Sequence, residues 1–488
     1  MKNFFKLQSF IIAIIIAIGF SFGGCASGNS GKATVVKVAI VPAGISIIKG
    51  ESWAFIAQVV GAGDPAKTVT WSIEQDNTAS GTSIDSEGRL TVAADESLEN
   101  ITIKAVSTVD KTKSASASVT IITNPAFTEK QPFNDITASQ LVAGIKIGWN
   151  LGNTLDASGM GWLGANPSIV QMETGWIGGV TRATRKENFE ALKNGGFNAV
   201  RIPVSWNKVV DKEYNIRPDW MARVTEIVNY AVETDLYILL NTHHDEDIFK
   251  FTDSRKDESL KAFGTIWRQI AENFKNYNEK LVFEALNEPR TKGSSAEWSG
   301  GTAAEHAILN EHYRLFVDTV RKTGGNNDKR ILMVNTYAAS AEAAAINGLE
   351  IPNDTVPDKI IASIHAYAPY NFALNTGGGS TPNWSVSNPN DTSPITNALD
   401  RAREKFINNG IPVIMGEFGA MDRKNEETRA AWAKFYVSEA KKRGIPCFWW
   451  DNYGFGPGGE IFGLLDRATN TFRFPLLLEG LMEGAGVR

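Results

Sequence analysis

The C-terminal part of the 488-residue chain carries eight short apolar runs that alternate with longer amphipathic stretches. Continuous runs rich in Val, Ile, Leu and Phe are typical of parallel strands that are covered on both faces. Between several of them, apolar residues recur at helical spacing, at 221–234, 259–277, 305–323 and 427–443. The runs lie at 144–152, 198–204, 236–243, 281–288, 330–336, 360–367, 412–419 and 446–452. This alternation predicts an α/β fold, a (β/α)₈ TIM barrel.

Residues 33–123 show a different pattern, with short β-branched runs that often alternate in polarity and are separated by Gly, Asp and Ser. The runs lie at 35–41, 53–60, 68–73, 89–93, 101–107 and 115–122. Such a series predicts a small all-β sandwich, and we expect Trp71 in its core. Residues 124–133 are then a linker, and the barrel occupies residues 134–488.

Two glutamates close apolar runs at the expected C-terminal face of the barrel, where the chemistry of this fold lies. They are Glu288 and Glu417, and the register of the eight runs predicts that they meet across the barrel mouth. A buried strand often ends in a polar residue, so one such glutamate is weak evidence of function. A pair of carboxylates on opposite sides of one bond is the equipment for glycoside hydrolysis, with one carboxyl protonated and the other ionised.

The other polar residues do not form a metal or nucleotide motif. His243 and His244 are adjacent, so their side chains point to opposite faces of a strand, and their spacing with Asp245 or Glu246 matches no zinc pattern. The glycines at 377–379 lie in a long loop, not between a strand and a helix, which disfavours phosphate binding. We expect neither a metal nor another cofactor.

The composition of the chain indicates which classes of ligand it binds. A net charge of −5 and a pI near 5.8 disfavour a nucleic-acid-binding protein. The 13 tryptophans suit a sugar-binding cleft, because aromatic faces supply contact area and orientation. We expect the loop 368–396, with Trp384, to form one wall of this cleft. The tryptophans expected in or beside loops above the strands are Trp162, Trp176, Trp206, Trp298 and Trp384.

Residues 134–480 resemble glycoside hydrolase family 5, the large cellulase family of the retaining barrel enzymes. The shared stretches cover seven of the eight strand ends in order, and the ordered set is far more specific than any one of them. They are Gly148-Trp-Asn-Leu-Gly-Asn-Thr-Leu-Asp156, Val200-Arg-Ile-Pro203, Asn241-Thr-His-His244, Leu286-Asn-Glu-Pro289, His365-Ala-Tyr367, Gly416-Glu-Phe-Gly419 and Phe448-Trp-Trp-Asp-Asn452.

The resemblance implies double displacement, with Glu417 as nucleophile and Glu288 as general acid/base, their carboxyls about 5–5.5 Å apart. Arg201 and Tyr367 are the expected partners that keep Glu417 ionised. Arg201 has a second interpretation as a buried structural ion pair, and Glu284 is expected to be a buried partner. The other site residues that we expect are Asn287 on the sugar 2-hydroxyl, His243 and His365 in the cleaved subsite, Trp450 as a stacking platform, and Asn153, Asp156, His244 and Trp384 as further substrate contacts.

We therefore expect a retaining endo-β-1,4-glucanase that acts as a monomer on a plant cell-wall β-glucan. The stretch from Gly148 to Asp156 resembles the subfamily that includes cellulases, xyloglucanases and mixed-linkage glucanases. Xyloglucan and mixed-linkage glucan are the alternative substrates, and mannan is a less favoured one. An alternative from another class is a glycan-binding lipoprotein on a barrel without activity.

The N-terminus predicts export. Lys2 and Lys6 precede an apolar run at 10–20, as in a signal peptide, here residues 1–24. Phe22-Gly-Gly-Cys25 resembles the bacterial lipoprotein signal, with Phe where Leu is usual, which implies lipidation at Cys25 and a cell-envelope protein of the outer membrane or cell surface. The alternative is an ordinary cleaved signal and secretion. Residues 25–32 are small and polar, as in a flexible tether.

Two short stretches of the β-rich region, Thr70-Trp-Ser-Ile73 and Asp85-Ser-Glu-Gly-Arg-Leu-Thr-Val92, resemble bacterial Ig-like domains of group 2. We expect this domain to lift the barrel from the membrane, with glycan binding as the alternative. The only other cysteine, Cys447, is expected to be a buried apolar side chain, and two cysteines exclude a disulfide framework.

Overall fold

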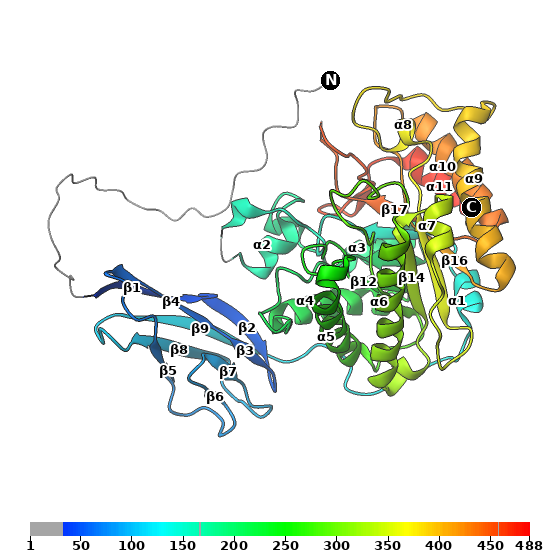
Figure 1. Ribbon diagram of the computed structural model, residues 1–488. Helices are drawn as coiled ribbons and strands as arrows, with labels where there is room; N and C mark the ends of the chain where they lie inside the picture. The colour runs from blue at the N-terminus through cyan, green and yellow to red at the C-terminus, as the bar shows by residue number, and fades with distance from the viewer. Residues whose placement is uncertain (1–32, 165–166, 457) are drawn as a thin grey trace.

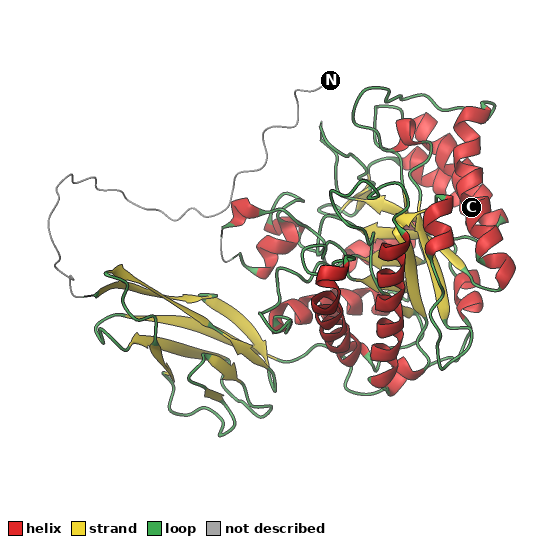
Figure 2. Ribbon diagram, in the orientation of Figure 1, coloured by secondary structure: helices red, strands yellow, loops and turns green. Residues whose placement is uncertain are grey.

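The computed structural model describes residues 33–164, 167–456 and 458–488, so the expected signal peptide, the tether and Cys25 lie outside the described residues. Within these ranges, eight parallel strands close a barrel in chain order, and helices surround it (Figures 1 and 2). The strands are β10 (Gly148–Leu151), β11 (Ala199–Ile202), β12 (Tyr237–Asn241), β13 (Leu281–Glu284), β14 (Leu332–Ser340), β15 (Ile360–His365), β16 (Val413–Phe418) and β17 (Cys447–Asp451). Each falls within or overlaps a predicted run, which confirms the (β/α)₈ barrel.

The four predicted helices are present as α4, α5, α6 and α10. Helix α4 begins three residues earlier than expected because Pro218 occupies its first turn, where its missing N–H costs no hydrogen bond. Among the described residues, no helix combines the length and apolar composition that crossing a membrane requires. The helices are α1 (Ala138–Gly144), α2 (Ile169–Thr174), α3 (Lys186–Gly195), α4 (Pro218–Glu233), α5 (Lys256–Phe274), α6 (Ala303–Lys322), α7 (Ala343–Gly348), α8 (Tyr370–Ala373), α9 (Pro389–Lys405), α10 (Glu426–Lys442) and α11 (Pro475–Ala485).

Every second side chain of a strand points into the barrel, so the inward-facing positions of the eight strands form layers. One of these layers is apolar and the next one toward the barrel mouth is polar. Leu141 and Val142 of α1 pack against the apolar layer. That layer consists of Ala199, Leu239, Val282, Met333, Ile361, Ile414 and Phe448. Two residues further along the strands, the same face carries Asn150, Arg201, Asn241, Glu284, Asn335 and Ser363, all fully buried. The apolar layer therefore supports a polar layer beneath the barrel mouth.

A bulge in β16 decides where Glu417 points. The register between β15 and β16 passes from Ile364 opposite Met415 to His365 opposite Glu417, so Gly416 is an extra residue on β16. A Cβ atom on Gly416 would lie 2.9 Å from Nε2 of His365 and 3.0 Å from Oγ of Ser363. The glycine thus permits the close approach of two strands that brings Glu417 beside His365.

Residues 34–122 form short strands that include a four-stranded sheet in the order β2-β9-β8-β5 and a three-stranded sheet in the order β3-β7-β6. The predicted run 53–60 is divided at Phe55, where the chain leaves β7 and begins to pair with β1. Trp53 is buried, whereas Trp71, which we expected in the core, is only partly buried at its edge. The strands are β1 (Thr34–Val41), β2 (Gly44–Ile48), β3 (Ser52–Ala54), β4 (Ile56–Ala62), β5 (Val69–Ile73), β6 (Ser83–Ile84), β7 (Arg89–Thr91), β8 (Asn100–Ser107) and β9 (Ser114–Ile122).

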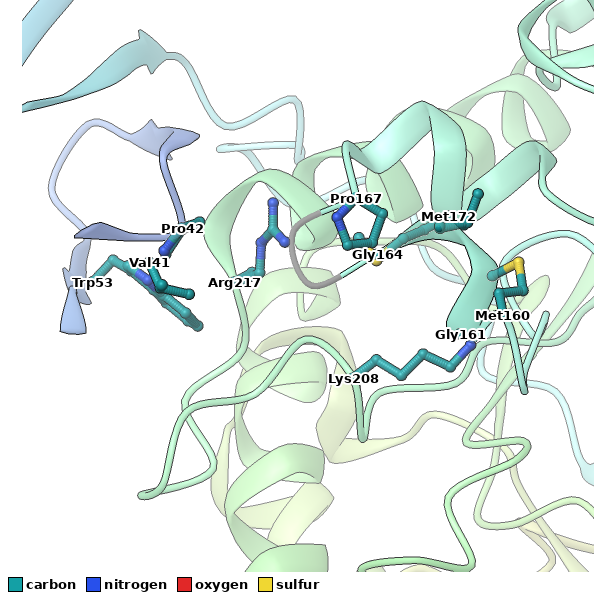
Figure 3. Close-up of a pocket in the computed structure, with 11 residues that line it drawn as sticks. Val41, Pro42, Trp53, Met160, Gly161, Gly164, Pro167, Met172, Lys208 and Arg217 are labelled. Carbon is teal, nitrogen blue, oxygen red and sulfur yellow. The ribbon is translucent and has the colours of Figure 1, made fainter. Parts of the chain in front are cut away.

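This β-rich region contacts the barrel on and just before α4. Arg89 donates to Glu213 over 2.8 Å, and the backbone N–H of Ser46 donates to Asp219 over 3.4 Å. A cavity of about 380 Å³ lies between the two parts (Figure 3). Its lining includes Trp53 from the β-rich region and Lys208 from the barrel, but neither Glu288 nor Glu417. The two carboxylates therefore lie elsewhere, at the strand ends.

Candidate active site

Glu288 and Glu417 meet at the mouth of the barrel. Glu417 is the penultimate residue of β16, and Glu288 lies four residues beyond the end of β13. A carboxylate oxygen of each lies within 4.8 Å of the other. The side chain of Glu417 is 6% exposed and that of Glu288 is 19% exposed, so Glu417 is nearly enclosed and Glu288 is the more accessible of the two. The geometry suits two carboxyl groups that act on one bond.

Arg201 organises the floor of this site. Its Nη1 donates to Glu417 over 2.7 Å, and its Nε donates to Glu284 over 2.5 Å. The side chain is fully buried. Burial lowers the pKa of Arg201, but the charges of Glu284 and Glu417 raise it by more, so the guanidinium remains protonated. Arg201 therefore forms buried ion pairs with both Glu284 and Glu417, while its role in keeping Glu417 ionised stays a prediction.

The remaining oxygen of Glu417 is held by Tyr367 and approached by His365. The hydroxyl of Tyr367 donates to Oε2 over 2.9 Å. Burial, and then the charges of Glu417 and Glu288, raise the pKa of Tyr367 well above its ordinary value, so it remains a neutral donor. Nδ1 of His365 lies 3.7 Å from the same oxygen of Glu417 and 3.1 Å from Oε1 of Glu288. His365 thus stands between the two carboxyl groups.

The surroundings of Glu288 favour its ionised form in the unliganded protein. Burial raises its pKa, but the hydrogen bond with His365 and the positive charges of His365, Arg290 and His244 lower it by more. The net result is a pKa below the ordinary value. This differs from the expectation that the site as it stands holds a proton on one carboxyl, and the reason is the cluster of cations behind Glu288.

His243 and Trp450 lie parallel to each other at the mouth, with ring centres 5.8 Å apart and planes within 3°. Burial and the charges of His244 and Arg201 lower the pKa of His243 well below its ordinary value, so its ring is neutral. The amide nitrogen of Asn241 lies 3.2 Å from Nδ1 of His243 and donates to it, because an amide NH₂ cannot accept. The proton of His243 is therefore on Nε2, which points toward Asp156, 4.0 Å away.

Asn287 is fixed by its carbonyl oxygen, which accepts a hydrogen bond from Nη2 of Arg201 over 2.8 Å. This contact leaves the amide NH₂ as the group that can serve a ligand. The carbonyl oxygen of Asn150 also accepts a hydrogen bond from Arg201, over 3.0 Å. The NH₂ group of Asn150, however, donates to the backbone carbonyls of Gly416 and of Phe448 on β17. Within the described residues, Asn287 is therefore the amide of the pair whose NH₂ group donates to no protein acceptor.

Two residues expected to contact sugar have mainly structural partners. Asp156 is fully buried, and its carboxylate accepts hydrogen bonds from the backbone N–H groups of Asn153 and Thr154. Asn153 has a positive φ of 53°, a conformation that this turn stabilises. Asp156 is thus a turn-forming residue next to His243, not an open sugar contact, while Asn153 remains partly exposed.

His244 lies on the outer side of His243, with the two rings edge to face at 4.5 Å. Its Nδ1 lies 3.5 Å from Glu246. Burial lowers the pKa of His244, but the hydrogen bond and charge of Glu246 raise it by more. A third of the side chain is exposed, so His244 faces the solvent side of the cleft, and the raised pKa favours its protonated form.

Trp384 does not line the cleft, and this expectation was wrong. The residue is 8% exposed, its indole N–H donates to the carbonyl of Asp391 over 3.1 Å, and its ring packs on Phe435 of α10. An indole that packs between its own loop and an outer helix has no face left for a sugar. Trp206 is likewise fully buried, whereas Trp162, Trp176 and Trp298 are exposed.

Sequence reasoning missed two charged residues near the carboxylates. Arg290 lies next to the quoted motif, and its Nη1 is 3.6 Å from Glu288. Glu460, on the loop after β17, has a raised pKa, caused by desolvation and by the negative charges of Glu288 and Glu417. The Asn-Glu-Pro-Arg sequence offered a signal for Arg290, but nothing in the sequence indicated that Glu460 faces the site.

Two groups of side chains in the described residues have ligand atoms close enough to hold a cation: Asp156 with His243 and His244, and Glu288 with His365 and Glu417. The oxygens of Asp156 accept backbone hydrogen bonds, and those of Glu417 are engaged by Arg201 and Tyr367. These atoms serve partners within the protein, and the absence of a metal stays a prediction.

Comparisons with known proteins agree with this geometry. The family model described as Cellulase (glycosyl hydrolase family 5) matches residues 155–456. Endoglucanase 1 of Ruminococcus albus is 45% identical over 344 residues, which cover 70% of this chain and 80% of that protein. The residues matched by the family model, 155–456, contain both Glu288 and Glu417.

Two solved structures share the barrel. A GH5-4 broad specificity endoglucanase from Ruminococcus champanellensis with bound cellotriose is 45% identical, with a TM-score of 0.69, and covers 72% of this chain and 100% of its own. A glycoside hydrolase 5 lichenase from Caldicellulosiruptor sp. F32, in a mutant complex with cellotetraose, is 39% identical, with a TM-score of 0.68, and covers 74% and 98%.

Proposed function

Because the chain belongs to glycosyl hydrolase family 5, we propose that it is a retaining endoglucanase that hydrolyses internal β-1,4-glucosidic bonds of plant cell-wall β-glucan. The curated relative is an endoglucanase, and two similar structures hold cellotriose and cellotetraose. A β-1,4-glucan chain is therefore the substrate class that the comparisons support.

The observation that carries the mechanism is the separation of the two carboxyl groups. Retaining glycosidases hold them about 5–5.5 Å apart, whereas inverting enzymes leave about 6.5–9.5 Å for a water molecule. One oxygen of Glu288 and one oxygen of Glu417 lie within 4.8 Å of each other, which is closer to the separation of retaining enzymes than to that of inverting enzymes. This separation supports direct attack by one carboxylate and retention of configuration.

In the first step, Glu417 attacks the anomeric carbon while Glu288 protonates the leaving glycosidic oxygen. The contacts with Arg201 and Tyr367 support Glu417 as the nucleophile, because a donor on each of its two oxygens fixes the orientation of its side chain. In the second step, Glu288 removes a proton from water, which attacks the glycosyl-enzyme and releases Glu417. The free NH₂ of Asn287 supports a contact with the sugar 2-hydroxyl that strengthens in the transition state.

Glu288 must be protonated for the first step, and substrate binding favours this form because it raises the pKa of Glu288. Burial is the largest influence on its pKa and raises it. A bound glucan excludes more water from the carboxyl and brings no charge, so the pKa rises further in the complex. Trp450 is parallel to the neutral His243 but only 7% exposed, so its role as the stacking platform for the sugar at the cleavage site stays a prediction.

Mixed-linkage β-glucan is a second candidate substrate, favoured by the likeness to a lichenase. Purified residues 33–488 would be incubated with carboxymethylcellulose, barley β-glucan, tamarind xyloglucan and glucomannan, and initial reducing-end release measured. We expect the highest rate on a β-1,4-linked or mixed-linkage glucan. Glu288→Gln is the matched control and should lower the rate by about 10²–10⁴-fold. Binding without release by the folded wild-type protein would instead indicate a non-catalytic glycan-binding protein.

The nucleophile is tested separately with a 2-fluoro cellobioside that traps the glycosyl-enzyme. Peptide mapping should find the label on Glu417. A label on any other residue would overturn the assignment, and Glu417→Gly should remain unlabelled.

We further propose that the protein is an exported lipoprotein that acts as a monomer, with Cys25 lipidated and residues 33–123 serving as an Ig-like spacer. The support is the sequence of residues 1–32 and the β-strands of 34–122. Cys25→Ala expressed in a bacterial host should move from the membrane fraction to the soluble exported fraction. Continued membrane association of this variant would refute the lipid anchor, and light scattering of residues 33–488 would measure the mass in solution.

A further inference from the structure

Arg290 contacts both the backbone and the side chain of Glu288. Its Nη1 donates to the backbone carbonyl of Glu288 over 2.8 Å and lies 3.6 Å from the side-chain Oε2. The same guanidinium contacts Glu246 over 3.3 Å and Glu297 over 3.3 Å. The residue is 8% exposed, so these four contacts fix its position. Arg290 therefore holds both the main chain and the side chain of Glu288.

Trp298 covers the outer side of this guanidinium. The guanidinium carbon of Arg290 lies 4.6 Å from the centre of the Trp298 ring, and the residue is 63% exposed. One face of the indole is therefore occupied by the cation, while most of the ring is open to solvent. Glu297, next to Trp298, accepts a hydrogen bond from the backbone of Gly293 over 2.7 Å, which closes the loop that presents the indole.

We propose that Arg290 is the positioning residue for Glu288 and that Trp298, stacked on Arg290, is a platform for the leaving-group sugar. This proposal rests on the proposed function, because it assigns Glu288 the acid role. The acid protonates the oxygen of the departing sugar, so that sugar lies on the Glu288 side of the cleaved bond. Trp298 is on the same side, one contact beyond the arginine that touches Glu288. An exposed indole there suits the apolar face of a pyranose.

The charge of Arg290 gives the proposal a measurable consequence. Arg290 is one of the cations that lower the pKa of Glu288 in the unliganded protein. Removing it should raise that pKa, and activity should then persist to higher pH. The titratable and charged groups that face Glu288 are His365 from β15, Tyr367 beyond it, Glu417 from β16, His244 from the loop after β12, Glu460 from the loop after β17, and Arg290 itself.

The first experiment compares full-length wild type with Arg290→Gln, Arg290→Lys and Arg314→Gln. Arg314 is a matched control, because its side chain is 52% exposed on α6. The pH profile of kcat/KM on cellotetraose would be measured for each. For Arg290→Gln we expect the alkaline limb to move up by about one pH unit. Arg290→Lys, which keeps the charge, and Arg314→Gln should keep the limb of the wild type.

The second experiment tests the platform with two substrates. Cellotetraose has a sugar leaving group, whereas 2,4-dinitrophenyl β-cellobioside has a leaving group that is not a sugar and needs no protonation. We expect Trp298→Ala to lower kcat/KM on cellotetraose about 5- to 10-fold and Trp298→Phe to restore most of it. On the dinitrophenyl substrate, Trp298→Ala should stay within about twofold of wild type.

Two results would overturn the proposal. If Arg290→Gln folds and its alkaline limb matches that of the wild type, Arg290 does not have the positioning role. If Arg290→Gln does not fold, a shifted alkaline limb in Arg290→Lys would rule out the positioning role. Equal effects of Trp298→Ala on both substrates remove the platform. Failure of the proposed function looks different, because the wild type itself would then not cleave cellotetraose, or Glu288→Gln would match it.

Discussion

Nδ1 of His365 lies 3.1 Å from Oε1 of Glu288. The same nitrogen is 3.7 Å from Glu417, so one ring lies between the proposed acid/base and the proposed nucleophile. A change of charge on either carboxyl group therefore alters the electrostatic environment of the other carboxyl group through His365. The protonation of Glu288 is not a property of that residue alone, and its dependence on pH reports the whole site.

Substrate binding should shift the pH dependence of the reaction. The profile of kcat/KM reports groups of the free enzyme, and that of kcat reports the complex. As the proposed acid, Glu288 acts in its protonated form, so a lowered pKa should bring the loss of activity to lower pH. The pKa is lowered in the free protein, and we expect it to rise when a bound glucan excludes water. We expect the alkaline limb of kcat on cellotetraose to lie at higher pH than that of kcat/KM, and coincident limbs would contradict this.

A methyl group at Gly416 should disturb catalysis more than folding. Its Cβ would lie 2.9 Å from Nε2 of His365, so the ring or the bulge must move. We expect Gly416→Ala to lower kcat by up to about 10²-fold, since small misplacements of catalytic groups have this effect. Gly378→Ala is the control, because a Cβ there meets nothing within 4 Å. A kcat equal to wild type in both would show that the bulge does not need glycine.

Loss of Arg201 should destabilise the barrel as well as stop turnover. Arg201→Met leaves Glu284 and Glu417 buried without their cation. Removing one partner of a buried ion pair costs about 3–5 kcal/mol of unfolding free energy. Urea denaturation would measure this, with the exposed Arg314→Met as a control expected within about 0.5 kcal/mol of wild type. A loss below about 1 kcal/mol would mean that the site relaxes around the two carboxylates.

Trp384 should contribute to stability and not to substrate binding. Trp384→Ala removes a buried indole from the packing against Phe435, at a cost of about 3–5 kcal/mol in unfolding free energy. The exposed Val386→Ala on the same loop should change stability by less than about 0.5 kcal/mol. At a temperature where the variant is folded, KM on barley β-glucan should stay near wild type. A raised KM with unchanged stability would restore the cleft-wall interpretation.

The pattern of apolar residues was sufficient to predict the barrel strands and the residues at their ends. The eight runs identified the strands because strands covered on both faces are apolar throughout. The same register placed Glu288 and Glu417 at one face, since the ends of parallel strands in a barrel meet there. The contacts of Arg201 and Tyr367 with Glu417 agree with the sequence expectation for the same reason.

Loop residues were less predictable. Trp384 and Trp298 are both tryptophans of loops above the strands, yet one packs against α10 and the other is exposed over Arg290. No periodicity separates them, because a loop has no fixed face. Asp156 was similarly misjudged, because its carboxylate accepts hydrogen bonds from the backbone N–H groups of Asn153 and Thr154 in a turn that the sequence pattern did not reveal.

The sequence by itself determined the barrel, the family and the pair of glutamates, because these depend on the order and polarity of the strand residues. Only the tertiary structure decided the position of Glu417 relative to His365 and the charges that surround Glu288. The bulge at Gly416 brings Glu417 beside His365, and Arg290 and His244 place positive charge around Glu288. Electrostatic influence depends on distances between residues far apart in the chain, and those distances exist only after folding.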